Sequence, residues 1–127
     1  MEEYWKLGEV VPYKIAVNIG RQSWKIYEIM DRDIKRMIGE QFIRAVDSIA
    51  ANIAEGYGRF HFMDRIKFYY NARGSLFEVK HWLLVLKERN VITLECFEQN
   101  LKEVNTLHRE LNTYIKICLN NKKINNK

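Results

Sequence analysis

The chain has 127 residues, enough for one hydrophobic core and too few for two. Apolar residues make up 47% of it and proline occurs once, which excludes a disordered chain and disfavours a β architecture with many turns. The net charge of +5 points to an acidic partner, with nucleic acid as the first candidate. Part of this charge lies in the Asn- and Lys-rich segment 121–127, which we expect to be a flexible tail behind a single domain over residues 1–120.

Nothing in the sequence predicts export or membrane insertion. Residues 1–5 contain no basic segment leading into an apolar stretch, as a secretory signal would. The longest uninterrupted apolar run, residues 82–86, is far shorter than the roughly 20 residues of a membrane span. Cys96 and Cys118 fall about 33 Å apart along one expected helix, too far for a disulfide. We therefore expect a cytoplasmic protein with reduced thiols and no membrane contact.

Four segments carry apolar residues at helical spacing, with short breaks between them. They cover about residues 12–30, 34–57, 62–89 and 94–120. Pro12 suits a first helical turn, and Asp31 and Thr93 suit N-terminal caps. The last segment has the clearest bundle stripe, formed by Leu94, Phe97, Leu101, Val104, Leu111 and Cys118. Short connections make neighbouring helices antiparallel, so the predicted fold is an all-α, up-down-up-down four-helix bundle.

A polar pattern in the second and third expected helices exceeds what a bundle needs. It reads RAVDSIAANIAEGYGR over residues 44–59 and NARGSLFE over residues 71–78, and Gln41 precedes it. This pattern resembles the hallmark of the four-helix bundle proteins encoded by intervening sequences within bacterial large-subunit ribosomal RNA genes. The resemblance extends over essentially the whole chain. It implies a left-handed bundle, often assembled as a homopentamer, with no established enzymatic activity.

The wider group of this family includes accessory proteins of diversity-generating retroelements. These resemble basic pentameric barrels that engage reverse transcriptase and RNA. The resemblance therefore implies two kinds of partner for a basic bundle, an RNA and a reverse transcriptase.

Six polar residues of the pattern are candidates for a structural network. They are Ser48, Asn52, Glu55 and Arg59 on the second expected helix, and Ser75 and Glu78 on the third. Steps of four, three and four place the first group on one stripe of its helix, and the second group lies three apart. If the stripe is covered, these side chains need hydrogen-bond partners. We interpret the network as one that fixes helix register or a subunit contact. A ligand or RNA contact and a solvated face remain the alternatives.

A row of cations recurs every seven residues on the third expected helix, formed by Arg73, Lys80 and Lys87. With Arg59, these residues are the candidates for binding nucleic-acid phosphates, and such binding would weaken steeply with salt. The alternative is a solvated face. The turn before this helix combines aromatic and basic residues, namely Tyr57, Arg59, Phe60, His61 and Phe62. This cluster would suit the stacking of unpaired bases, or else a hydrophobic plug or subunit contact.

No constellation predicts catalysis. Glu78 and His81 form one Glu-x-x-His pair, whereas di-iron bundles use two such pairs with two further glutamates. The sequence contains no glycine-rich phosphate loop and no evident activated nucleophile. We expect no metal, no cofactor and no enzymatic activity. Trp24, Trp82 and the other aromatic residues present more surface than a thin bundle readily encloses, which favours a homo-oligomer.

The sequence thus predicts a non-catalytic, RNA-associated homo-oligomer, and the resemblance implies a pentamer. The alternative is a protein-interaction scaffold or a retroelement accessory protein, whose basic surface binds an acidic partner or a reverse transcriptase.

Overall fold

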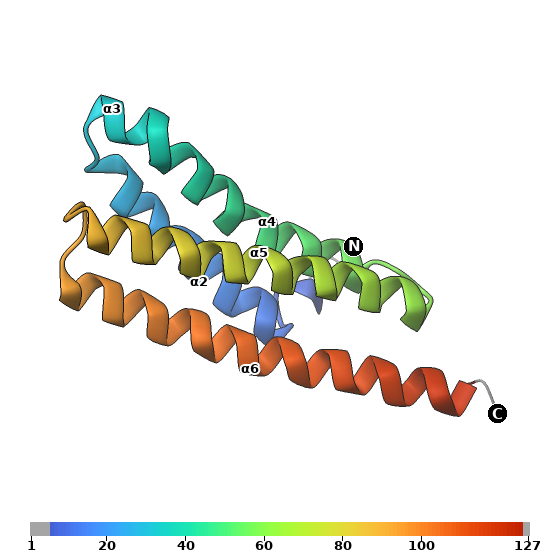
Figure 1. The fold of residues 1–127 in the computed structure, drawn as a ribbon. Helices are drawn as coiled ribbons and strands as arrows, with labels where there is room; N and C mark the ends of the chain where they lie inside the picture. Colours follow the sequence, from blue (N-terminus) through green and yellow to red (C-terminus); the bar gives the residue numbers. More distant parts are fainter. Residues whose placement is uncertain (1–5, 126–127) are drawn as a thin grey trace.

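The computed structural model describes residues 6–125 and confirms an all-α bundle (Figure 1). Its arms are α2 (Val11–Glu28), a second arm made of α3 (Arg32–Ile34), η1 (Lys35–Gly39) and α4 (Glu40–Tyr57), then α5 (Phe62–Glu88) and α6 (Leu94–Asn125). α4 packs against α2 and α5, and α6 packs against α5 and α2. Helices that follow one another in the chain are therefore neighbours, and α2 lies diagonally across from α5. None of the described residues forms a strand.

The helix boundaries follow the capping signals in the sequence. The Asp31 carboxylate accepts a hydrogen bond from the Ile34 amide at 2.9 Å, and the Thr93 hydroxyl accepts one from the Cys96 amide at 3.0 Å. Each satisfies an amide that the first helical turn leaves without a partner. Asn90 follows α5 with a φ of 58°, a left-handed conformation that asparagine tolerates better than most residues. These contacts confirm the expected helix starts at Asp31 and Thr93.

α6 is longer than the sequence pattern indicated. No glycine or proline follows Gly74 anywhere in the chain, so no residue type that breaks helices interrupts α6. The helix continues to Asn125, which makes the backbone helical over residues 121–125, where we expected the tail. Residues 126 and 127 of that tail lie outside the described residues.

The second arm contains a π-helical turn that periodicity alone did not predict. In η1 the amide of Glu40 donates to the carbonyl of Lys35, five residues earlier. The consecutive residues Ile38 and Gly39 are both buried there. A Cβ atom at Gly39 would lie 3.0 Å from the Tyr27 ring of α2 and 2.9 Å from the Met30 sulfur just beyond that helix, so close packing accompanies the wider turn.

All four arms contribute to one core. Its fully buried side chains include Ile19 of α2, Phe42, Ile49 and Ile53 of α4, Leu76, Val79 and Leu83 of α5, and Val104, Leu107 and Leu111 of α6. Burial of each such side chain contributes roughly 1.5–3 kcal/mol before the cost of ordering the chain. The expectation that Leu94 joins this core is wrong, since its side chain, in the first turn of α6, is 59% exposed.

Candidate nucleic-acid interface

Three of the six predicted network residues join α4 to α5. The hydroxyl oxygens of Ser48 and Ser75 lie 2.8 Å apart across the two helices. The Asn52 amide donates to the Ser48 carbonyl at 2.8 Å and to its hydroxyl at 3.1 Å. All three side chains are half-buried. They form a polar contact between α4 and α5, hereafter the serine clasp.

The other three predicted residues do not join this clasp. Arg59 pairs with Glu55 at 2.8 Å, and their side chains are 46% and 54% exposed. Glu78 accepts a hydrogen bond from the Trp82 indole at 3.3 Å, within α5. Glu55 lies about two turns beyond Ser48 along α4 and is 54% exposed, where it pairs with Arg59 just beyond the end of its own helix. A shared stripe on one helix therefore did not produce a single network.

The predicted basic row lies along the boundary between α5 and α6. Arg73, Lys80 and Lys87 are each half-buried. Arg73 donates to the Asn112 side chain of α6 at 3.0 Å. Among the described residues, the only salt bridges are Arg59 with Glu55 and Lys87 with Glu88. Arg73 and Lys80 thus carry charges that no carboxylate of the described chain pairs within 4 Å.

Aromatic rings support every cation of this row. The distances from cation to ring centroid are 4.8 Å for Arg73 over Tyr70, 4.9 Å for Lys80 over Phe77 and 5.2 Å for Lys87 over Phe97. Such contacts hold a cation at a ring face without neutralising its charge. We call the five residues Tyr70, Arg73, Phe77, Lys80 and Lys87 the cationic–aromatic face of α5.

His108 of α6 adds an imidazole to this face. Its ring lies edge-on to Phe77, with the centroids 5.1 Å apart. Partial burial, followed by the positive charges of Lys80 and Arg73, lowers the pKa of His108 below its ordinary value. The imidazole is therefore neutral at pH 7, and an anion bound between these cations would raise its pKa.

A second heptad row on α5 lies outside the residues that the sequence predicted as a site. Met63, Tyr70, Phe77 and Leu84 are spaced by seven residues, and their exposed fractions are 55%, 41%, 52% and 46%. α5 is therefore apolar on its outer side as well as on its core side. The signal was present in the sequence as a repeat of seven that does not coincide with the core heptad. We call these four residues the outer stripe.

Arg59, the fourth predicted phosphate contact, lies apart from the row. It sits at the turn between α4 and α5, where its guanidinium lies 4.8 Å from the centroid of the Phe68 ring. The aromatic–basic turn is only partly a plug, because Phe62 packs against the core while Phe60 is 85% exposed.

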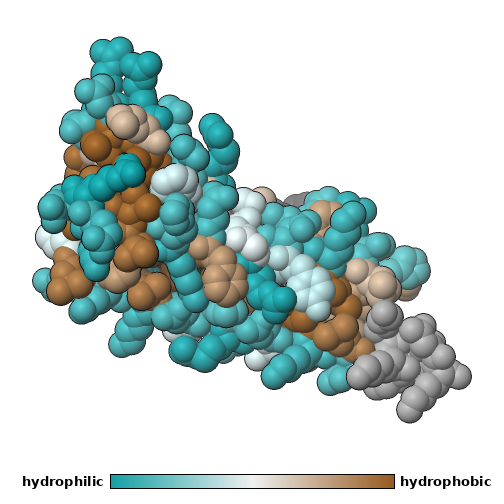
Figure 2. Space-filling view, in the orientation of Figure 1, coloured by the Kyte–Doolittle hydropathy of each residue, from teal (hydrophilic) through white to brown (hydrophobic). Residues whose placement is uncertain are grey.

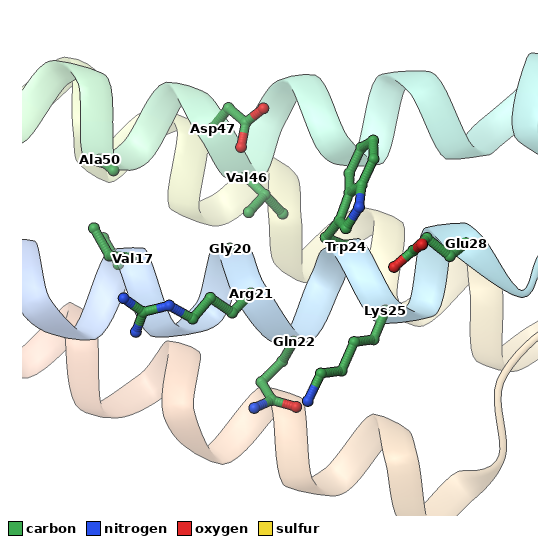
Figure 3. A pocket seen from close by; sticks show the side chains of 11 residues that line it. Val17, Gly20, Arg21, Gln22, Trp24, Lys25, Glu28, Val46, Asp47 and Ala50 are labelled. Carbon is green, nitrogen blue, oxygen red and sulfur yellow. The ribbon is translucent and has the colours of Figure 1, made fainter.

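The opposite side of the bundle carries an open groove between α2 and α4, with a volume of about 630 Å³. Small residues form part of its lining, namely Ala16, Gly20 and Ala50. A Cβ atom added at Gly20 would meet nothing within 4 Å. Figure 3 shows the Trp24 ring extending from α2 toward α4 at one end of the groove, and this side chain is 51% exposed.

Exposed hydrophobic residues are not confined to these two sides. Figure 2 shows them among hydrophilic residues, most extensively at the end of the bundle that carries α3. Ile29 and Met37, which flank α3 in sequence, are 80% and 64% exposed. Within residues 6–125, no helix is long and apolar enough to cross a membrane. The same residues contain no group of three His, Cys, Asp or Glu side chains placed to hold a metal ion.

The fold and its surfaces define a four-helix bundle protein whose opposite sides differ: one is cationic and aromatic, and the other carries a groove lined in part by small residues. The profile of the family described as "23S rRNA-intervening sequence protein" matches residues 9–113. The chain belongs to this family.

Comparison of structures supports the same fold. A crystal structure from Bacteroides thetaiotaomicron, of a protein of unknown function from the S23 ribosomal protein family, superimposes with a TM-score of 0.78. The two sequences are 22% identical, and the match covers 91% of this chain and 99% of that one. At this identity the likeness establishes the fold alone. No curated protein matches the sequence.

Proposed function

We propose that this chain is a non-catalytic, RNA-associated protein that binds RNA through the cationic–aromatic face of α5. The observation that carries the proposal is that the charges of Arg73 and Lys80 are not paired within residues 6–125. Both hold their charge beside an exposed ring, and no carboxylate of the described chain pairs with either. A polyanion would neutralise these charges, and exposed bases would stack on Tyr70 and Phe77.

The spacing of the face suits a nucleic-acid strand that contacts it at intervals. Residues seven apart on a helix are separated by about 10.5 Å along its axis. A single strand lying along α5 could therefore place phosphates at successive cations, with unpaired bases beside the rings between them. Between them, the rings would offer stacking surfaces worth roughly 1–3 kcal/mol per base.

We further propose that the chain forms a homo-oligomer, and the resemblance stated above implies a pentamer. Support comes from the exposure of Trp24 beside the α2–α4 groove, where Gly20 leaves room for an approaching side chain. A surface of this kind on a small bundle typically marks a protein contact. It lies across the bundle from the cationic–aromatic face, so assembly through it would leave that face open to RNA.

One experiment tests assembly and RNA binding together. Solution mass is measured by light scattering with and without a single-stranded RNA, at low and moderate salt. We expect a species near five times the monomer mass that gains RNA mass at low salt. A monomer that is indifferent to RNA would contradict both proposals.

A charge-reversal pair tests the face itself. Lys80→Glu places a negative charge at its centre, and Lys14→Glu makes the same change in net charge on an exposed site of α2. We expect Lys80→Glu to weaken RNA binding at least about tenfold at low salt and to reduce the salt slope by about one. Lys14→Glu should change affinity far less. Equal weakening by both variants would mean that only the net charge matters.

The second candidate is a protein-interaction scaffold that binds an acidic protein or a reverse transcriptase. The aliphatic ends of the outer stripe, Met63 and Leu84, favour it, because exposed aliphatic side chains suit a protein surface better than a nucleic acid. Leu84→Ser separates the two functions. If RNA is the partner, this variant should bind RNA as tightly as wild type. If a protein packs on the outer stripe, the variant should bind that protein more weakly.

A further inference from the structure

The turn between α4 and α5 forms a pocket at one end of the bundle, with a volume of about 580 Å³. Its lining consists of Lys6, Leu7, Ala54, Tyr57, Gly58, Arg59, Phe60 and Arg65. Apolar residues and a tyrosine share this lining with three cationic side chains, and no carboxylate is part of it. The volume falls within the range of roughly 300–1,000 Å³ that small-molecule pockets occupy.

Phe60 is the feature of this pocket that nothing in the described chain explains. Its side chain is 85% exposed, more than any other large hydrophobic residue in the described part of the protein. Its only ring neighbour there is His61, edge-on at 5.2 Å between centroids. At least one face of the Phe60 ring is therefore available to a flat partner.

The two arginines of the pocket are held in place before any ligand arrives. Arg65 donates through Nε to the Arg59 carbonyl at 2.6 Å and lies 5.3 Å from the centroid of the Phe62 ring. Arg59 is held by Glu55 and by the Phe68 ring. Binding of an anion here would therefore lose little side-chain entropy, because these side chains are already ordered. Arg65 has no salt bridge to any described carboxylate, so its charge remains for a ligand.

From this geometry we infer that the pocket binds one unpaired nucleotide of an RNA strand, with its base against Phe60 and its phosphate against Arg59 and Arg65. The inference rests on the proposed RNA function and adds a class of substrate to it. A base within a duplex has both faces covered by its neighbours, whereas an unpaired base can leave the strand and stack on an aromatic side chain. An aromatic wall beside fixed guanidinium groups matches a planar base that carries a phosphate.

The pocket is close enough to the cationic–aromatic face for one strand to reach both. Arg65 and Arg73 are eight residues apart on α5, which corresponds to about 12 Å along the helix axis. A strand anchored at the pocket by one flipped base would continue along α5 with its phosphates near Arg73 and Lys80. The pocket would then select strands with unpaired nucleotides, while the face supplies affinity that depends on salt.

Phe60→Ala tests the pocket, and Ile29→Ala is its matched control. Both remove a large apolar side chain that is at least 80% exposed, so neither should disturb the fold. Ile29 belongs to the connection between α2 and α3, which lies at the end of the bundle away from the turn between α4 and α5 (Figure 1). The probes are a short oligouridine strand and a blunt RNA duplex with the same number of phosphates, both titrated into the full chain. We expect Phe60→Ala to weaken single-strand binding about 5- to 150-fold, the factor for one lost stack, and to leave duplex affinity and both salt slopes unchanged. Phe60→Trp, which keeps an aromatic ring at this position, should bind the single strand about as tightly as wild type.

Each remaining outcome decides against the inference in a distinct way. If Phe60→Ala matches wild type on the single strand while Lys80→Glu still weakens it, the pocket is not a nucleotide site and the proposed RNA function stands. Equal weakening on strand and duplex would mean that Phe60 does not read unpaired bases. A change in solution mass with Phe60→Ala and no RNA present would assign the ring to a subunit contact. If wild type binds neither RNA, both the pocket and the proposed function fail.

Discussion

The two sides of α4 differ in how closely the neighbouring helix approaches. Toward α5, a Cβ atom at Gly56 would lie 2.7 Å from the Tyr69 ring, and the serine clasp joins the helices nearby. Toward α2, a Cβ atom at Gly20 would meet nothing within 4 Å, and a groove remains open. A glycine in a helix costs roughly 1 kcal/mol relative to alanine in both places. Only at Gly56 does close packing within the chain explain that cost. At Gly20 no contact within the described chain explains it.

The stability of the close contact between α4 and α5 should also depend on pH. Tyr69 covers Gly56 and is 2% exposed, and its ring lies edge-on to Tyr114. Burial, with a smaller contribution from Cys118, raises the pKa of Tyr69 from 10.0 to about 12. Above pH 10 the unfolded chain loses this proton while the folded chain keeps it. The contribution of Tyr69 to the free energy of unfolding is therefore fully present below about pH 10 and falls as the pH rises toward 12.

The largest expected effect follows from this titration. Over that interval wild type should lose about 2–3 kcal/mol through Tyr69 alone, and Tyr69→Phe should abolish that part of the loss. The measurement is urea unfolding at several pH values from neutral to alkaline. Tyr70→Phe, an exposed neighbour on α5, should keep the wild-type dependence. A Tyr69→Phe protein that weakens at alkaline pH as steeply as wild type would show that Tyr69 does not remain protonated in the folded state.

The glycine pair tests the comparison directly. Gly56→Ala should destabilise the protein by about 2 kcal/mol, because the added methyl meets the buried Tyr69 ring and lies 3.2 Å from the Arg65 carbonyl. Gly20→Ala should stabilise the monomer by up to about 1 kcal/mol, because its site is empty and alanine favours helix. Denaturant unfolding of both variants measures the difference. Equal effects of the same sign would mean that α4 is not packed differently on its two sides.

Gly20→Ala also tests whether the groove is a contact between subunits. If the groove is a subunit contact, a methyl group at its lining should shift the solution mass toward smaller species even while each subunit becomes more stable. Gly74→Ala is the control, since that site is also open but lies on the exposed outer side of α5.

The elements of this fold were predictable because their signals are local. Asp31 and Thr93 cap helices through amides three residues away, and the core stripes repeat within one helix. The polar pattern was predictable only in part, because its contacts are not local. Ser48 and Ser75 meet across two helices, and no spacing within either helix decides whether Glu55 or Glu78 also reaches that contact.

The candidate interface shows the same limit. The spacing of Arg73, Lys80 and Lys87 was visible in the sequence, but their support by rings was not, because Phe97 belongs to another helix. His108 and Asn112 of α6 join the face only through the relative shift of α5 and α6 along their axes. That shift is set by packing of the whole core and has no signature in a single helix. The open groove at Gly20 was missed because a glycine reads the same in sequence whether its surroundings are full or empty.

The smallest expected effect concerns the serine clasp. Ser75→Ala removes the hydroxyl that lies 2.8 Å from Ser48, while Asn52 still donates to Ser48 within α4. Because one partner of Ser48 remains, the loss should be about 1 kcal/mol, the net value of one hydrogen bond, and not the larger cost of a buried polar group left alone. Thr113→Ala, which removes an exposed hydroxyl that donates only within α6, should change stability by less than about 0.5 kcal/mol. A Ser75→Ala protein as stable as wild type would mean that Gly56 and Tyr69 hold α4 against α5 without the clasp. The polar pattern would then require an explanation outside the monomer.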